Sequence, residues 1–123
     1  MAFTKPDRLA VVSLWADDVP TTVHFYRDVI GLTLLPHHGH RPAFDLGDGV
    51  HLVIVQGQRV SQRESGTSRF PSIAFAVQDL DEAVAHLEGH VVRLPWGIEA
   101  GPQARWVIFY DPAGNLIEFA QFE

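Results

Sequence analysis

Histidines, aspartates and glutamates are the residues of this 123-residue chain that could move protons or bind a divalent ion. Three of the seven histidines, His37, His38 and His40, lie close together in a proline-flanked segment. Their spacing on an irregular loop makes a poor metal chelate, so we interpret the segment as a solvated loop that could gate a pocket. The chain has no cysteine, which excludes disulfides, cysteine zinc sites, iron–sulfur clusters and a cysteine nucleophile.

The remaining titratable candidates divide into helix residues and strand residues. Asp17 and Asp18 directly precede Val19 and Pro20, a pattern that fits the start of a helix better than a catalytic pair. Asp79, with Glu82 three residues later, is a possible capping box at the start of the second expected helix. Glu118 and His51 lie in expected strands and are the candidates for proton transfer. His24, His86 and His90 fall on or just after expected helices, and we interpret them as surface residues.

Composition limits the class of protein. The net charge is −6 and 46% of the residues are hydrophobic, which is typical of one acidic globular domain and argues against a nucleic-acid binder. Apolar runs such as 52–55 are far shorter than the roughly 18 residues of a membrane span. The N-terminal segment lacks the apolar stretch of a signal peptide. We therefore predict a cytoplasmic domain with no membrane or nucleic-acid partner.

Hydrophobic patterning predicts the same order of elements twice. Each half is expected to contain a strand, a helix and three further strands. We place module one at about 9–57, a polar linker at about 58–69 and module two at about 70–123, within a single domain covering 1–123. The predicted strands cover 9–16, 32–35, 43–46, 50–56, 71–77, 91–94, 104–110 and 116–122.

The two halves also align residue by residue, which indicates an internal repeat. Val11-Val12-Ser13-Leu14 aligns with Ser72-Ile73-Ala74-Phe75 at an offset of 72 − 11 = 61. Leu52-Val53-Ile54 aligns with Ile117-Glu118-Phe119 at an offset of 118 − 53 = 65. Phe44 and Phe109 share this second offset, and both are expected in the core. The growth of the offset by four is consistent with a longer loop around 97–103.

Two stretches of the chain resemble the vicinal oxygen chelate superfamily, the glyoxalase/bleomycin resistance protein/dioxygenase group. Residues 25–32, FYRDVIGL, resemble the end of its first helix, and residues 110–119, YDPAGNLIEF, resemble its DPxGN hairpin and final strand. The resemblance implies an α+β fold. Two tandem βαβββ modules would form a cup-shaped mixed β-sheet, with the helices on its outer face. It also implies a homodimer.

The resemblance also places the metal ligands of the metal-dependent members at Val11, Val53, Ser72 and Glu118. Valine has no donor atom and a neutral serine is a poor ligand, so we predict no metal cofactor and disfavour glyoxalase and dioxygenase chemistry. His51 shares strand parity with Val53 and could join Glu118 in an atypical divalent-metal site. The alternative is that His51 makes hydrogen bonds near the rim of the cup.

Alternation along the strands points Ser13, Trp15, Ala74 and Glu118 into the implied cup. Inside it, Glu118 would be a ligand-binding carboxylate or a general base. Alternatively, it would only hydrogen-bond Ser13, Ser72 or a tyrosine. Trp15 and Trp106 would stack on a flat ligand or pack at a subunit interface, and the sequence leaves both alternatives open.

We therefore predict a metal-free protein that binds a small antibiotic-like or aromatic molecule. An alternative is a glyoxalase-like lyase or isomerase, or a dioxygenase, that uses Glu118 and His51 with an atypical metal or none. A third hypothesis is a partner-binding module without a pocket. The predicted ligand-binding residues are Ser13, Trp15, Val53, Ser72, Ala74, Trp106 and Glu118.

Overall fold

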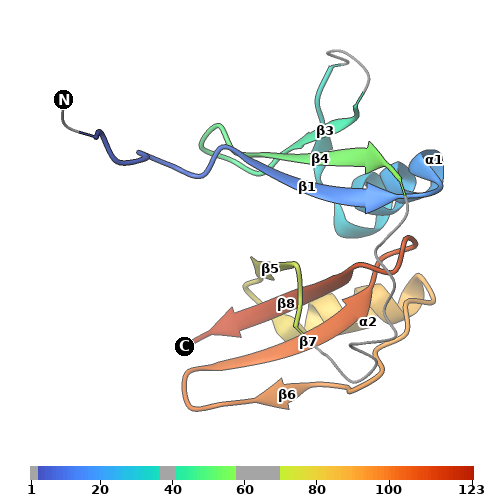
Figure 1. The fold of residues 1–123 in the computed structure, drawn as a ribbon. Helices are drawn as coiled ribbons and strands as arrows, with labels where there is room; N and C mark the ends of the chain where they lie inside the picture. Colours follow the sequence, from blue (N-terminus) through green and yellow to red (C-terminus); the bar gives the residue numbers. More distant parts are fainter. Residues whose placement is uncertain (1–2, 37–40, 58–69) are drawn as a thin grey trace. The chain divides into compact units, whose positions relative to one another are not determined.

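The structure is a computed structural model that describes residues 3–36, 41–57 and 70–123 (Figure 1). The predicted loop containing His37, His38 and His40 and the predicted linker at 58–69 lie outside the described residues. The chain divides into two compact units, Met1–Gly57 and Gln58–Glu123. Each has a strand, a helical segment and three further strands in that order, which confirms the predicted α+β fold of two βαβββ modules.

The first unit is a four-stranded mixed sheet with strand order β1-β4-β3-β2. Strands β1 and β4 are parallel, and the other neighbours are antiparallel. The helix runs from α1 directly into a π-helical segment, η1, and ends at Gly31, whose φ of 91° is accessible to glycine at little cost. The elements are β1 Val11–Ala16, α1 Val19–His24, η1 Phe25–Ile30, β2 Thr33–Leu34, β3 Ala43–Asp45 and β4 His51–Gln56.

The second unit repeats this plan with strand order β5-β8-β7-β6, in which β5 and β8 are the parallel pair. Its helix α2 lies along β7 and β8 (Figure 1). Neither α2 nor any other helix in the described part of the chain is long and apolar enough to cross a membrane. The elements are β5 Ile73–Ala76, α2 Leu80–Gly89, β6 Glu99–Ala100, β7 Ala104–Tyr110 and β8 Leu116–Phe122.

Strand register confirms the internal repeat. Ser13 is the Cα partner of Val53 in the first unit, and Ala74 is the partner of Glu118 in the second. Adding 61 to the first member and 65 to the second converts one pair into the other. The antiparallel pairs are related as well: adding 65 to both members converts the pair of Phe44 with Leu52 into the pair of Phe109 with Ile117.

Both helices begin at the predicted aspartates. The Asp18 carboxylate accepts a hydrogen bond from the Thr21 backbone N–H at 3.1 Å, and Asp79 accepts one from the Glu82 N–H at 3.1 Å. Each bond satisfies a donor that the first helical turn leaves unpaired. Hydrogen bonds from the Thr21 side chain and backbone lower the pKa of Asp18, so this residue caps the helix as a carboxylate.

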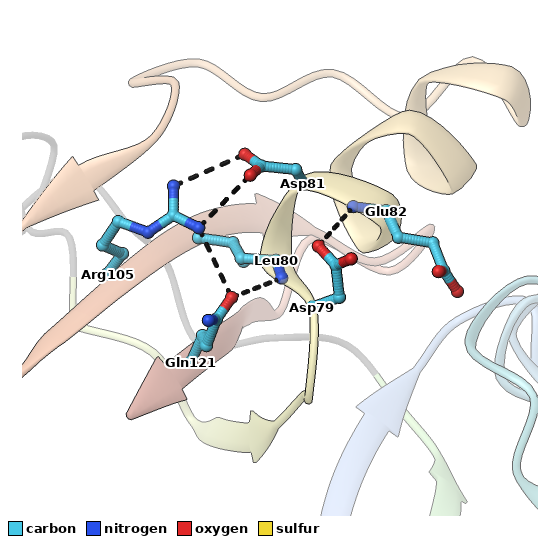
Figure 2. A network of polar contacts seen from close by, with 6 residues as sticks. All are labelled: Asp79, Leu80, Asp81, Glu82, Arg105 and Gln121. Carbon is cyan, nitrogen blue, oxygen red and sulfur yellow. Dashed lines mark hydrogen bonds and ion pairs between the residues drawn. The ribbon is translucent and has the colours of Figure 1, made fainter. Parts of the chain in front are cut away.

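A polar network fixes the start of α2 over the sheet (Figure 2). The Gln121 side-chain oxygen accepts hydrogen bonds from the Leu80 backbone N–H at 2.7 Å and from Arg105 at 3.4 Å. The same guanidinium reaches the Asp81 carboxylate at 3.4 Å. Gln121 and Arg105 are Cα partners on β8 and β7, so this bonding identifies the face of the sheet that α2 covers.

The core of each unit lies between its helix and its sheet. In the first unit, Leu14 and Ile54 are buried, and the Tyr26 ring lies 6.1 Å from the Phe44 ring. In the second, Phe109 and Phe119 pack edge to face with their ring centroids 5.1 Å apart. The predicted burial of Phe44 and Phe109 is confirmed, since both are 0% exposed.

Equivalent hairpins close the two sheets with turns of different backbone conformation. In the second unit, the Asp111 carboxylate accepts hydrogen bonds from the Ala113 N–H, the Asn115 N–H and the Asn115 side chain at 2.8–3.0 Å. In the first unit, residues 47–49 all have positive φ, with Asp48 at 53° between two glycines. Both turns therefore combine an aspartate with left-handed backbone, since Asp45 accepts from the Gly47 N–H at 2.8 Å and Gly114 has a φ of 89°. They differ in degree: three consecutive residues are left-handed in the first turn, and one carboxylate accepts three hydrogen bonds in the second.

The prediction of a strand at 91–94 is wrong. Val91 has a φ of 62° and follows the C-cap of α2, so the chain leaves the helix through a left-handed residue rather than entering an extended strand. Strand β6 instead lies at Glu99–Ala100, inside the segment predicted to be a loop. Trp96 precedes this strand.

We expect Phe109→Ala to lower the free energy of unfolding by about 3–5 kcal/mol, because it empties a fully buried site that the Phe119 ring borders. Phe122→Ala is the matched control, since Phe122 is 65% exposed, and it should cost less than about 1 kcal/mol. Urea unfolding measures both values. Equal losses in the two variants would contradict the placement of the core.

Candidate functional site

We call the face of each sheet opposite its helix the helix-free face. In the first unit this face carries every second residue of β1 and β4, because the intervening residues Leu14, Ala16, Leu52 and Ile54 are buried. The predicted residues Ser13, Trp15, His51 and Val53 therefore share one face. The Cα partners across its parallel pair are Val11 with His51, Ser13 with Val53 and Trp15 with Val55.

The Trp15 ring packs closely against a glycine. Its side chain is 51% exposed, yet its ring lies directly over Gly57, the residue after β4. A Cβ at residue 57 would lie 2.8 Å from Cζ3 of the ring and closer still to Cε3. Real Cβ contacts are almost never this short, so the ring can occupy this position only because residue 57 is glycine.

The helix-free face of the second unit carries Ala74, Trp106 and Glu118. Ala74 and Glu118 are Cα partners, and Ile108 is the partner of Glu118 on β7. Trp106 is one pair further along, opposite Ala120. The predicted residue Ser72 lies just before β5 and is exposed, and its backbone N–H donates to the Leu116 carbonyl at 2.7 Å.

Glu99 is a residue of this face that sequence reasoning missed. It is the Cα partner of Trp106, whose indole N–H donates to the Glu99 carboxylate at 3.2 Å. A charged residue in a two-residue strand gives no periodic signal, and the segment was predicted to be a loop. The repeat was the available signal. Since β2 pairs with β3 in the first unit, the equivalent strand of the second unit had to pair with β7.

Trp106 also lies against a glycine. A Cβ at Gly101 would lie 3.3 Å from two ring atoms of Trp106, which is tighter than most real Cβ contacts. Gly101 pairs with Ala104 through a backbone hydrogen bond of 2.9 Å and so belongs to the turn between β6 and β7. Two contacts thus fix this indole: the hydrogen bond to Glu99 on its edge and Gly101 against its ring.

The Glu118 carboxyl group has an unusual electrostatic environment. Burial raises its pKa above the ordinary value of 4.5, and the negative charge of Glu99 raises it further. Among the described residues of the second unit, no hydrogen bond or ion pair stabilises this carboxylate. The predicted alternative in which Ser72 bonds it is therefore not what the structure contains.

The four positions that the resemblance assigns to metal ligands do not form a donor set. Val11 and Val53 have only hydrocarbon side chains, and Ser72 is an exposed neutral hydroxyl. Zinc, nickel and iron sites need several imidazole, thiolate or carboxylate ligands. Within residues 3–36, 41–57 and 70–123, no three His, Cys, Asp or Glu side chains are grouped to hold an ion. The residues at these four positions therefore do not fit a divalent-metal site.

Comparisons with known proteins agree with this architecture. The family model described as Glyoxalase/Bleomycin resistance protein/Dioxygenase superfamily matches residues 8–119. The chain is 31% identical over 121 residues to the uncharacterized protein YaeR of Escherichia coli (strain K12), a match that covers 87% of this chain and 90% of YaeR.

Two solved structures illustrate the range of proteins that share the fold. TnmS3, an antibiotic binding protein from Streptomyces sp. CB03234, has a TM-score of 0.79 at 21% identity, covering 98% of this chain and 100% of that chain. A lactoylglutathione lyase from Agrobacterium tumefaciens has a TM-score of 0.72 at 23% identity, covering 96% of each chain. Likeness at these identities shows the fold alone.

We expect Gly57→Ala to displace the Trp15 ring, because the added methyl group would occupy the space of the indole. A changed tryptophan emission maximum and near-ultraviolet circular dichroism spectrum would report the displacement. Gly89→Ala is the matched control, since a Cβ there meets nothing within 4 Å. An unchanged spectrum in Gly57→Ala would contradict the contact.

We expect Glu118→Gln to stabilise the fold increasingly as the pH rises above 4.5. Below that pH the carboxyl is protonated in both states. Above it the unfolded chain releases the proton first, so the native state loses stability as the pH rises until its own carboxyl group ionises, and the loss then stays at its full value. Urea unfolding across this pH range measures the difference, and Glu88→Gln controls for the loss of one negative charge. A pH-independent difference for Glu118→Gln would contradict the raised pKa.

Proposed function

Because this chain belongs to the Glyoxalase/Bleomycin resistance protein/Dioxygenase superfamily, we propose that it binds a small, flat, positively charged aromatic molecule without using a metal ion. One observation carries the proposal. The helix-free face of each unit presents a tryptophan whose ring lies against a glycine, Trp15 against Gly57 and Trp106 against Gly101.

A fixed indole is a good surface for a flat ligand. Aromatic rings bind one another through large buried area and offset or edge contacts. A ring that is already held in position loses little conformational freedom when the ligand arrives, so more of the contact energy becomes affinity. For Trp106 this restriction comes from the hydrogen bond to Glu99 together with the Gly101 backbone, and for Trp15 the Gly57 backbone lies against one face of the ring.

The charges of the second unit favour a cation. Glu99 touches the Trp106 indole, and Glu118 lies on the same face with a raised pKa. A positive group beside Glu118 would restore its ionised form, and a cation over the Trp106 ring would gain a cation–π contact. The antibiotic binding protein TnmS3, which has the same fold, supports a binding role for this architecture.

The other predicted residues would each add contacts to a ligand within their own unit. Val53 and Ala74 would provide apolar contact, and Ser13, Ser72 and His51 would orient polar groups of the ligand. A homodimer stays a prediction. The catalytic alternative, in which Glu118 and His51 act in a lyase, isomerase or dioxygenase, also stays a prediction.

Isothermal titration with proflavine, a flat aromatic cation, tests the proposal. We expect Trp106→Ala and Trp15→Ala each to weaken binding by about tenfold, because each removes a stacking surface. Glu118→Gln should weaken proflavine binding more than binding of acridine, measured at a pH where acridine is neutral. Phe3→Ala is the control, since Phe3 is 85% exposed and precedes β1, outside the strands that carry the proposed surface.

Two outcomes would contradict the proposal. One is proflavine binding that is unchanged in both tryptophan variants. The other is equal loss of proflavine and acridine binding in Glu118→Gln, which would remove the argument for a cation.

A further inference from the structure

Two histidines lie one helical turn apart on the exposed side of α2. His86 and His90 are separated by four residues, the spacing that places side chains next to each other on a helix. Both are exposed, whereas Leu80 and Leu87 of the same helix are buried. Since α2 covers the face opposite the helix-free face, this pair is separate from Trp106 and Glu118.

The two imidazole rings are already close together. Their centroids are 4.7 Å apart, and their planes are inclined by 59°, so they are not stacked. Two imidazoles that ligate one ion through nitrogens at about 2.1 Å have centroids about 4.5–5.5 Å apart. The observed separation therefore matches that of a chelating pair before any ion is added.

We propose that His86 and His90 form a two-ligand surface site for a late first-row divalent ion. Imidazole nitrogen suits Cu²⁺, Ni²⁺ and Zn²⁺, and the general affinity order makes Cu²⁺ the tightest of the three. No third His, Cys, Asp or Glu is grouped with the pair among the described residues, so water would occupy the remaining coordination positions.

Nearby charge and local structure both favour such a site. Glu82 lies four residues before His86 on the same side of α2 and adds a negative charge without being a required ligand. His90 is the C-cap, and Val91 directly after it has left the helical conformation. An ion that bridges the two rings would hold this last turn together and stabilise the folded state over the unfolded one.

Titration of the full chain with Cu²⁺, followed by two-dimensional amide NMR, tests the proposal. Paramagnetic Cu²⁺ broadens signals close to it, so the amides of residues 83–91 should be lost first when the ion is below one equivalent. His86→Asn and His90→Asn should each bind Cu²⁺ at least about tenfold more weakly than the parent, because the second ligand then no longer binds intramolecularly. The double variant should bind Cu²⁺ at this site no more tightly than either single variant.

Glu88→Gln is the matched control, because it changes a charged side chain of α2 that is not part of the pair, and it should retain the broadening. Parent-like affinity in either single-histidine variant would overturn the proposal. So would early broadening confined to β8 around Glu118, which would instead indicate an ion on the helix-free face. Neither result depends on whether proflavine binds, so this inference and the proposed function fail separately.

Discussion

The parallel pairing of the first and last strands in each unit is the constraint on which the rest of the structure depends. Side chains alternate between the two faces of a strand, so a register shift of one residue would bury Glu118 against α2 and expose Ile117 and Phe119. The register is fixed because both of these apolar residues are buried on the helix side. The position of Glu118 on the helix-free face therefore follows from the packing of its neighbours.

The two fixed tryptophans are not copies of each other. In the alignment of the two halves, Ala76 is the equivalent of Trp15 and Arg41 is the equivalent of Trp106. The glycines beside the two rings also come from different elements. Gly57 follows the last strand of the first unit, whereas Gly101 precedes the third strand of the second. The same physical arrangement, an indole against a residue without a side chain, therefore arises twice on two sheets that share a topology. This independence is what makes the pair informative about function.

Much of the fold could be predicted from the sequence because the repeat supplies long-range information that local patterns lack. The two offsets predicted the internal repeat that the strand register confirms, and Asp18 and Asp79 marked both helix starts. The segment at 91–94 failed because a short apolar run has no reliable period, and nothing local indicates the left-handed Val91.

Less of the candidate site could be predicted. Strand parity placed Ser13, Trp15, Ala74 and Glu118 on the helix-free faces. The contacts of the rings with Gly57 and Gly101 depend on side-chain conformation, which parity does not specify. Glu99 was missed because its strand is only two residues long. These features arise from tertiary packing, which short-range sequence patterns do not predict.

The two hairpin turns give the halves of the chain different freedom to change sequence. Losing the Asp111 carboxylate removes three hydrogen bonds at once, so the second turn is intolerant at Asp111 through its side chain and at Gly114 through its left-handed backbone. The first turn has its intolerant positions at Gly47 and Gly49, where any side chain would strain a left-handed backbone. The two halves therefore join equivalent strands with turns of different backbone conformation, so a sequence change that one turn tolerates need not be tolerated by the other.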